Sequence, residues 1–154
     1  MATTPMPPAS PAPPASPAPP VSTATLQRAL ADFFAPWVQA LDLHVEQHGA
    51  GEVTLRLPHS AQLSRVGDML CGQAMMAAAD TAMVLALISH FGQFKPCATV
   101  QLSSTFLRPL SGQDALVTAR VLRAGQSLAF GEIELRGAVD GKSVFRASTT
   151  YALM

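Results

Sequence analysis

The chain has 154 residues, of which 49% are apolar and 13% are charged, and its formal net charge is zero. A neutral chain with so few charges lacks the broad electrostatic footprint that binds DNA, RNA or an acidic membrane. High apolar content with little surface charge also indicates that a second copy of the chain covers part of the surface. We therefore expect a homo-oligomer whose partner is a small molecule, with no nucleic acid and no membrane.

Cys71 and Cys97 are the only cysteines, and their spacing fits neither a zinc site, a CxxC redox motif nor a disulfide framework. No basic segment followed by an apolar run opens the chain, so we expect no secretory signal. The longest apolar stretch is interrupted by Asp80 and is expected to be too short to span a bilayer. These features predict a cytoplasmic protein with reduced thiols that uses no metal and no other cofactor.

Residues 1–22 form a Pro/Ala/Ser repeat, which is too rich in proline for a helix and too poor in large side chains for a core. We predict a tail over 1–22 and a single domain over 23–154. The repeat is interpreted either as a solvated tail or as a ligand for a proline-binding domain, although it lacks the basic residues that flank such ligands.

The first elements of the domain are a short helix and a hairpin. Residues 23–34 have an amphipathic helical pattern, which Thr23 or Thr25 can cap and Pro36 ends. Apolar and polar residues then alternate in two runs around a reversal that contains Gly49 and Gly51. The predicted strands of this hairpin are residues 41–47 and 52–58.

After a loop at residues 64–72, a long helix follows over 72–90, and it is apolar nearly all round. Four strand-like runs come next, separated by turn-forming residues at hairpin lengths. They are residues 98–109, 114–124, 127–139 and 143–154. A sheet that curls around one apolar helix buries both, so the predicted fold is α+β, with an antiparallel sheet wrapped around a long central helix.

Asp80 is the only ionisable residue in the middle of this apolar helix. A buried, unpaired carboxylate costs several kcal/mol, and perturbed carboxylates collect at functional sites. Two interpretations stay open: Asp80 is a site residue, or it faces a subunit interface and pairs with an arginine such as Arg65. Gly72, at the start of the helix, offers free backbone amides at the positive end of the helix dipole, although a glycine there also serves chain reversal.

The run from Leu70 to Ala82 (LCGQAMMAAADTA), followed by Ser103 to Pro109 (SSTFLRP), resembles the hotdog-fold thioesterases of the phenylacetate-degradation type. In that family a His-Gly-Gly turn opens the central helix and an acidic residue lies two turns into it. The resemblance covers about residues 24–154. It implies a hotdog fold, a homodimer or homotetramer, and hydrolysis of acyl-CoA thioesters at sites shared between two subunits.

Carried over by position, Asp80 matches the family's general base or nucleophile, and Gly72 matches the glycine whose N–H polarises the thioester carbonyl. Gln73 and Arg65 fall beside this oxyanion site, where Arg65 replaces a polar amide. Substrate contacts are further predicted at four residues, of which Met76 is interpreted either as lining of an acyl tunnel or as core, and Arg108 as a cation for a CoA phosphate. They are Cys71, Met76, Thr81 and Arg108.

Two departures from the family pattern stand out, because Cys71 replaces its histidine and Gln73 replaces its second glycine. Cys71 is interpreted either as a small packed thiol or as a nucleophile activated by the helix N-terminus, for which no histidine lies nearby in sequence. The loss of the histidine also leaves a second functional hypothesis open. It is a non-catalytic acyl-CoA-binding protein with the same fold.

Overall fold

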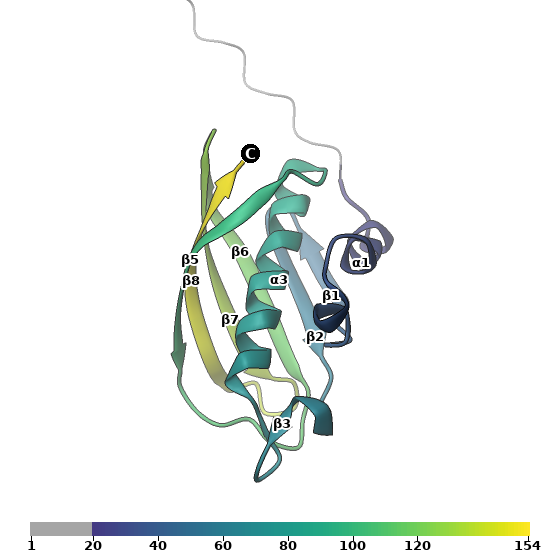
Figure 1. The fold of residues 1–154 in the computed structure, drawn as a ribbon, viewed down its shortest axis with the longest axis vertical. Helices are drawn as coiled ribbons and strands as arrows, with labels where there is room; N and C mark the ends of the chain where they lie inside the picture. Colours follow the sequence, from purple (N-terminus) through teal and green to yellow (C-terminus); the bar gives the residue numbers. More distant parts are fainter. Residues whose placement is uncertain (1–19) are drawn as a thin grey trace, which may run out of the picture.

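The structure, a computed structural model, describes residues 20–154, so the prediction for the tail lies almost wholly outside the described residues (Figure 1). A six-stranded antiparallel sheet curves around the long helix α3, as predicted. The elements are α1 (Thr23–Asp32), α2 (Pro36–Gln39), β1 (His44–Gly49), β2 (Glu52–Leu57), η1 (Ala61–Leu63), β3 (Ser64–Arg65), β4 (Met69–Leu70), α3 (Gly72–Phe91), β5 (Cys97–Phe106), β6 (Ala115–Ala124), β7 (Leu128–Gly137) and β8 (Ser143–Leu153).

The strand order is β1-β2-β6-β7-β8-β5. The hairpins β1–β2, β6–β7 and β7–β8 confirm the predicted turns, with Gly51 and Gly141 at positive φ. The predicted hairpin between β5 and β6 is wrong, because β5 pairs with β8 and residues 107–114 carry the chain past the end of the sheet to β6 (Figure 1). β5 is therefore an edge strand.

Helix α3 has 20 residues and is long and apolar enough to cross a membrane by length and composition, so the expectation that it is too short was wrong. Its apolar character has another cause, since most of its surface packs against the sheet and α1. One stripe remains partly or fully exposed on the described surface. It consists of Gln73, Met76, Ala77, Asp80 and Val84.

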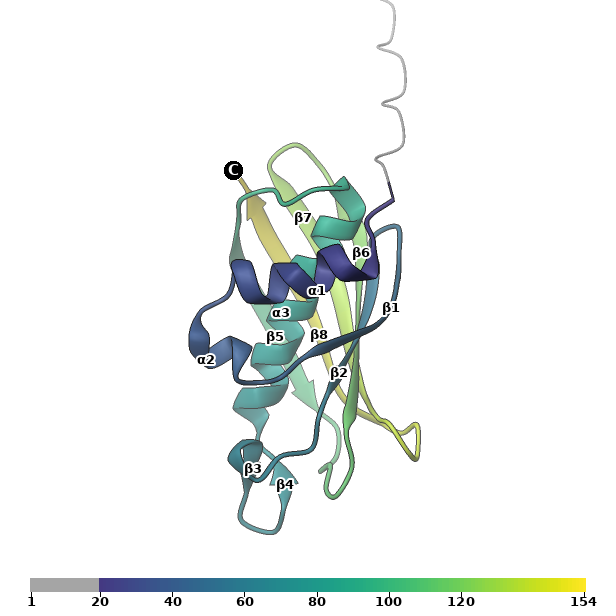
Figure 2. The ribbon, with the colours of Figure 1, turned by 90° about the vertical axis from the view of Figure 1, so that its right-hand side faces the viewer.

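Helix α1 lies across α3 and buries Leu26 and Leu30 (Figure 2). Its cap is Ser22, whose hydroxyl oxygen accepts the Thr25 N–H at 3.1 Å, and not Thr23 or Thr25 as predicted. The predicted loop at 64–72 also contains the small β3–β4 hairpin. This hairpin sets the entry into α3.

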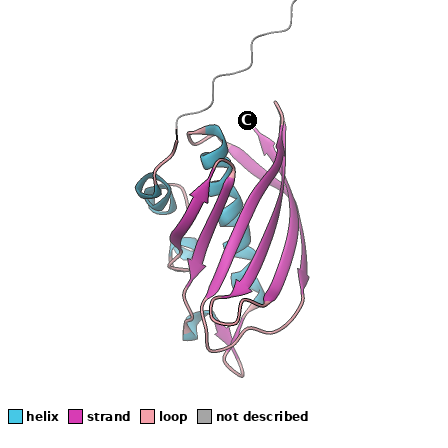
Figure 3. Cartoon of the chain, turned by 180° about the vertical axis from the view of Figure 1, so that it is seen from behind, coloured by secondary structure: helices cyan, strands magenta, loops and turns pink. Residues whose placement is uncertain are grey.

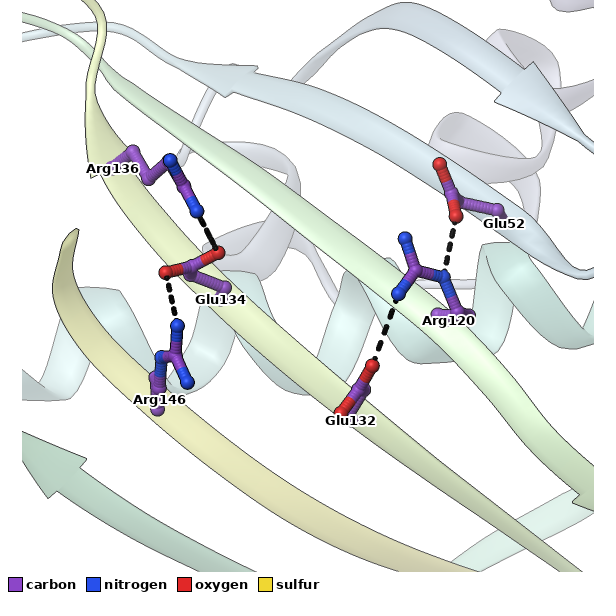
Figure 4. Close-up of polar contacts among 6 residues, drawn as sticks. All are labelled: Glu52, Arg120, Glu132, Glu134, Arg136 and Arg146. Atoms are coloured by element: carbon purple, nitrogen blue, oxygen red, sulfur yellow. Dashed lines mark hydrogen bonds and ion pairs between the residues drawn. The ribbon is translucent and has the colours of Figure 1, made fainter. Parts of the chain in front are cut away.

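The outer face of the sheet, seen from behind in Figure 3, carries two chains of ion pairs (Figure 4). Each chain joins neighbouring strands through arginine side chains that are more than half exposed, so each pair contributes little to stability. The pairs are Glu52–Arg120–Glu132 and Arg136–Glu134–Arg146. These charges are satisfied within the protomer, whereas the carboxylate of Asp80 belongs to α3, on the other face of the sheet.

Candidate active site

Asp80 lies in the exposed stripe of α3 and is bound by two hydroxyl groups. Its Oδ1 accepts hydrogen bonds from Thr99 Oγ1 at 2.9 Å and from the Tyr151 hydroxyl, which also lies 3.0 Å from the Asp80 backbone oxygen. Among residues 20–154 of the protomer, no Lys, Arg or His forms an ion pair with Asp80. Arg65 instead donates to the Met69 sulfur at 3.5 Å.

The sheet register explains why the two hydroxyls meet at Asp80. Thr99 on β5 and Tyr151 on β8 are cross-strand partners, so their side chains leave the sheet on the same face, toward α3. The register shifts between Thr99 and Gln101, which leaves Val100 as a bulge with 62% of its surface exposed. Bulges re-aim side chains next to sites, and here the bulge lets Thr99 point inward at an otherwise exposed edge.

The groups around Asp80 are uncharged at neutral pH. Burial, and then the nearby Asp80 carboxylate, raises the pKa of Tyr151 far above its ordinary value. Burial and the same carboxylate also raise the pKa of the Cys97 thiol. Tyr151 therefore acts as a neutral donor, and neither side chain supplies a charge that competes with Asp80.

Gly72 is the first residue of α3, and its N-cap residue Cys71 makes no side-chain cap hydrogen bond. The first amides of the helix are therefore free of the side-chain acceptor that usually binds them. A Cβ added at Gly72 would lie 3.0 Å from Cε1 of Phe106, so a side chain there would press on that ring. Gly72 and Phe106 line a cleft of about 360 Å³ together with Met75, and both Arg65 and Arg108 border it.

The cleft and the carboxylate lie at different places on the protomer. Gly72 and Asp80 are eight residues apart on one helix, which at the α-helical rise separates them by about 12 Å along the axis. The Gly72 amide and the Asp80 carboxylate of one protomer therefore cannot contact the same small group.

A family comparison supplies the chemistry of the chain. The chain matches the sequence model of the thioesterase superfamily over residues 67–143, a span that includes both Gly72 and Asp80. The chain belongs to the thioesterase superfamily. Its activity is thioester hydrolysis, which confirms the predicted family and enzyme class.

Individual relatives agree with this family. A Thermoplasma acidophilum protein named as a candidate esterase is 25% identical over 105 residues, which cover 68% of this chain and 76% of that protein. A candidate thioesterase from Silicibacter is 29% identical with a TM-score of 0.77, and the match covers 86% of this chain and 91% of that one. The PaaI protein of the Escherichia coli phenylacetic acid degradation operon has a TM-score of 0.74 at 20% identity over 86% and 93%, which supports the hotdog fold alone.

The remaining predicted site residues of the thioesterase differ in how far they are exposed. Gln73 and Met76 are exposed on the α3 stripe, where Met76 shows 38% of its surface. Cys71 is partly buried and packs against the core, as expected for a small packed thiol. Thr81 does not fit the predicted substrate contact, because it is 2% exposed and lies on the side of α3 that faces the core.

Sequence reasoning missed Thr99 and Tyr151, whose contacts with Asp80 bridge 19 and 71 residues. One signal was present, since Tyr151 is the only tyrosine and occupies an inward position of a strand. A buried phenol needs a hydrogen-bond partner, and Asp80, the one carboxylate of the apolar helix, needed donors as well.

Proposed function

We propose that this thioesterase hydrolyses acyl-CoA thioesters at sites shared between two protomers. In each site the amides of Gly72 and Gln73 bind the thioester carbonyl oxygen, and Asp80 of the partner subunit acts as general base or nucleophile. The observation that carries the proposal is the separation of Gly72 and Asp80 along α3, together with a carboxylate that has two hydroxyl donors but no ion-pair partner among residues 20–154 of its own protomer.

An exposed face of the protomer fits a second copy. The outer edge of β5 has no strand partner within the described protomer, and it borders the exposed α3 stripe. Two α3 helices packed antiparallel about a two-fold axis at Met76 would set Gly72 of one protomer level with Asp80 of the partner subunit, because both residues are four positions from Met76. Met76, which is exposed in the protomer, would then be covered.

The chemistry follows from these positions. The carbonyl oxygen accepts hydrogen bonds from the first amides of α3, and the helix dipole stabilises the negative charge that develops there. As general base, Asp80 removes a proton from a water molecule while the water oxygen bonds to the carbonyl carbon. The carbon–sulfur bond then breaks, and the proton held by Asp80 passes to the departing thiolate.

The two arginines that border the cleft suit a CoA ester. Arg108 follows β5 and is exposed, so its guanidinium is free to bind a phosphate of the CoA moiety. Arg65 lies closer in sequence to Gly72 and is proposed to help hold the carbonyl or the attacking water. Both assignments require a substrate whose acyl end enters the cleft at Phe106 and Met75.

The test is thiol release from acyl-CoAs of short, medium, long and aromatic chains, measured for the wild type and for Asp80→Asn. Loss of the base is expected to lower kcat by roughly 100-fold or more. Asp42→Asn is a matched control, because Asp42 is an exposed carboxylate whose ion pair is with His44. An Asp80→Asn variant with wild-type turnover would refute the role of this carboxylate.

A further inference from the structure

We propose that Tyr151 is a positioning residue that holds Asp80 by Oδ1 and leaves Oδ2 for the reacting water, an inference that rests on the proposed role of Asp80. The Tyr151 hydroxyl faces both Oδ1 and the backbone oxygen of Asp80. It has one hydrogen to give, and the bond to the charged carboxylate is the stronger one. The backbone oxygen has its own partner in the helix.

Water does not compete with Tyr151 for the hydrogen bond to the Asp80 carboxylate. Its side chain is 1% exposed, and its strand β8 is held on both sides, by β5 and β7. Thr99, the second donor, is exposed on the edge strand, so water can replace its hydroxyl. The phenol therefore fixes the carboxylate to the rigid part of the sheet, where a hydrogen bond in a low dielectric is strong.

The two carboxylate oxygens of Asp80 differ in their hydrogen-bond donors. Oδ1 receives both protein donors, while the structure assigns no donor to Oδ2 among the described residues. Tyr151 on β8 and Cys97 on β5 are the titratable groups that face Asp80 from the packed strands, and burial raises the pKa of both. The phenol thus remains protonated, and so a donor, at neutral pH.

Tyr151→Phe removes the donor and keeps the ring in the core. Loss of a hydrogen bond to a charged group is expected to lower kcat roughly 10- to 100-fold, with KM changed by less than about threefold. This split between kcat and KM is expected because the phenol contacts Asp80 and not the substrate. A residue that only maintains the fold would lower the fraction of folded enzyme and leave the kcat of the folded protein unchanged.

Thr149→Val is the matched control. Thr149 is also buried on β8, and its hydroxyl donates to the Gln101 backbone oxygen at 2.8 Å, away from Asp80. The control should lose a similar amount of stability and retain the wild-type kcat. If Tyr151→Phe has the wild-type kcat, Tyr151 does not position Asp80.

The failure of this inference can be told apart from failure of the proposed function. Asp80→Asn with full activity would remove the role of Asp80, whereas an inactive Asp80→Asn with an unaffected Tyr151→Phe removes only the role of Tyr151.

Discussion

Gly131 on β7 allows α3 to approach the sheet closely, and Gly131→Ala tests that packing. A Cβ built at Gly131 would overlap Sδ and Cε of Met83 and would lie 2.9 Å from the Arg120 carbonyl oxygen. Met83 is fully buried, so its side chain can move only by displacing other core residues. The Arg120 oxygen belongs to β6 and moves only with the strand. Since both a side chain and a backbone must shift, we expect a loss near the upper end of overpacking costs, about 3 kcal/mol.

This loss is measured by chemical or thermal unfolding at one fixed protein concentration, because association couples to stability. For a domain of this size the midpoint temperature should fall by roughly 10 °C. Gly49→Ala is the control, since a Cβ at Gly49 meets nothing within 4 Å. A Gly131→Ala variant within about 1 kcal/mol of the wild type would show that β7 and α3 are not packed as closely as described.

Two further predictions concern charge. The His59 backbone N–H, and then the Arg56 guanidinium, hold the pKa of Asp114 below its usual range. The stability that this carboxylate contributes is therefore present at neutral pH and is lost as the pH falls through its lowered pKa. Asp114→Asn should therefore cost about 1 kcal/mol in urea unfolding at pH 7 and less near pH 3, and an equal cost at both would contradict this linkage. Arg108→Met should raise KM severalfold for an acyl-CoA but not for an acyl-N-acetylcysteamine thioester, which lacks the phosphates. The control is Arg123→Met, which lies outside the cleft and should leave both KM values unchanged. An equal rise in KM for both substrates in Arg108→Met would rule out a phosphate contact.

The order and type of the main elements could be predicted because their signals are local. An apolar 20-residue run without proline specified α3, and the Gly51 and Gly141 turns specified two hairpins. The position of β5 could not be obtained in this way. Consecutive strands usually pair, but β5 joins β8 across the sheet, and this choice depends on packing around α3 and not on the residues between β5 and β6.

In the candidate site, too, only the residues with a local sequence signal could be predicted. Asp80 could be identified because a carboxylate in an apolar helix is costly, and Gly72 because the start of a helix leaves amides free. The donors to Asp80 depend on the β5–β8 register and the bulge at Val100, which no local pattern encodes. Thr81 shows the opposite error, since its place next to Asp80 in sequence turns it about 100° around the helix and into the core.

The central claim, a thioesterase site shared between two protomers, is tested most directly with hybrid dimers of Asp80→Asn and Gly72→Pro. Gly72 is the first residue of α3, where proline removes the N–H without breaking the helix, and the extended backbone of Cys71 suits a following proline. The proline Cβ would also press on the Phe106 ring in the cleft, so both changes should inactivate the Gly72 part of the site. Each variant alone should be inactive.

Unfolding the two variants together in equal amounts and refolding them should make half of the dimers mixed, each with one intact site. The account predicts acyl-CoA hydrolysis at about 25% of the wild-type rate for such a random two-fold mixture. No activity from a mixture that is shown to contain mixed dimers would contradict a site composed of Gly72 from one protomer and Asp80 from its partner.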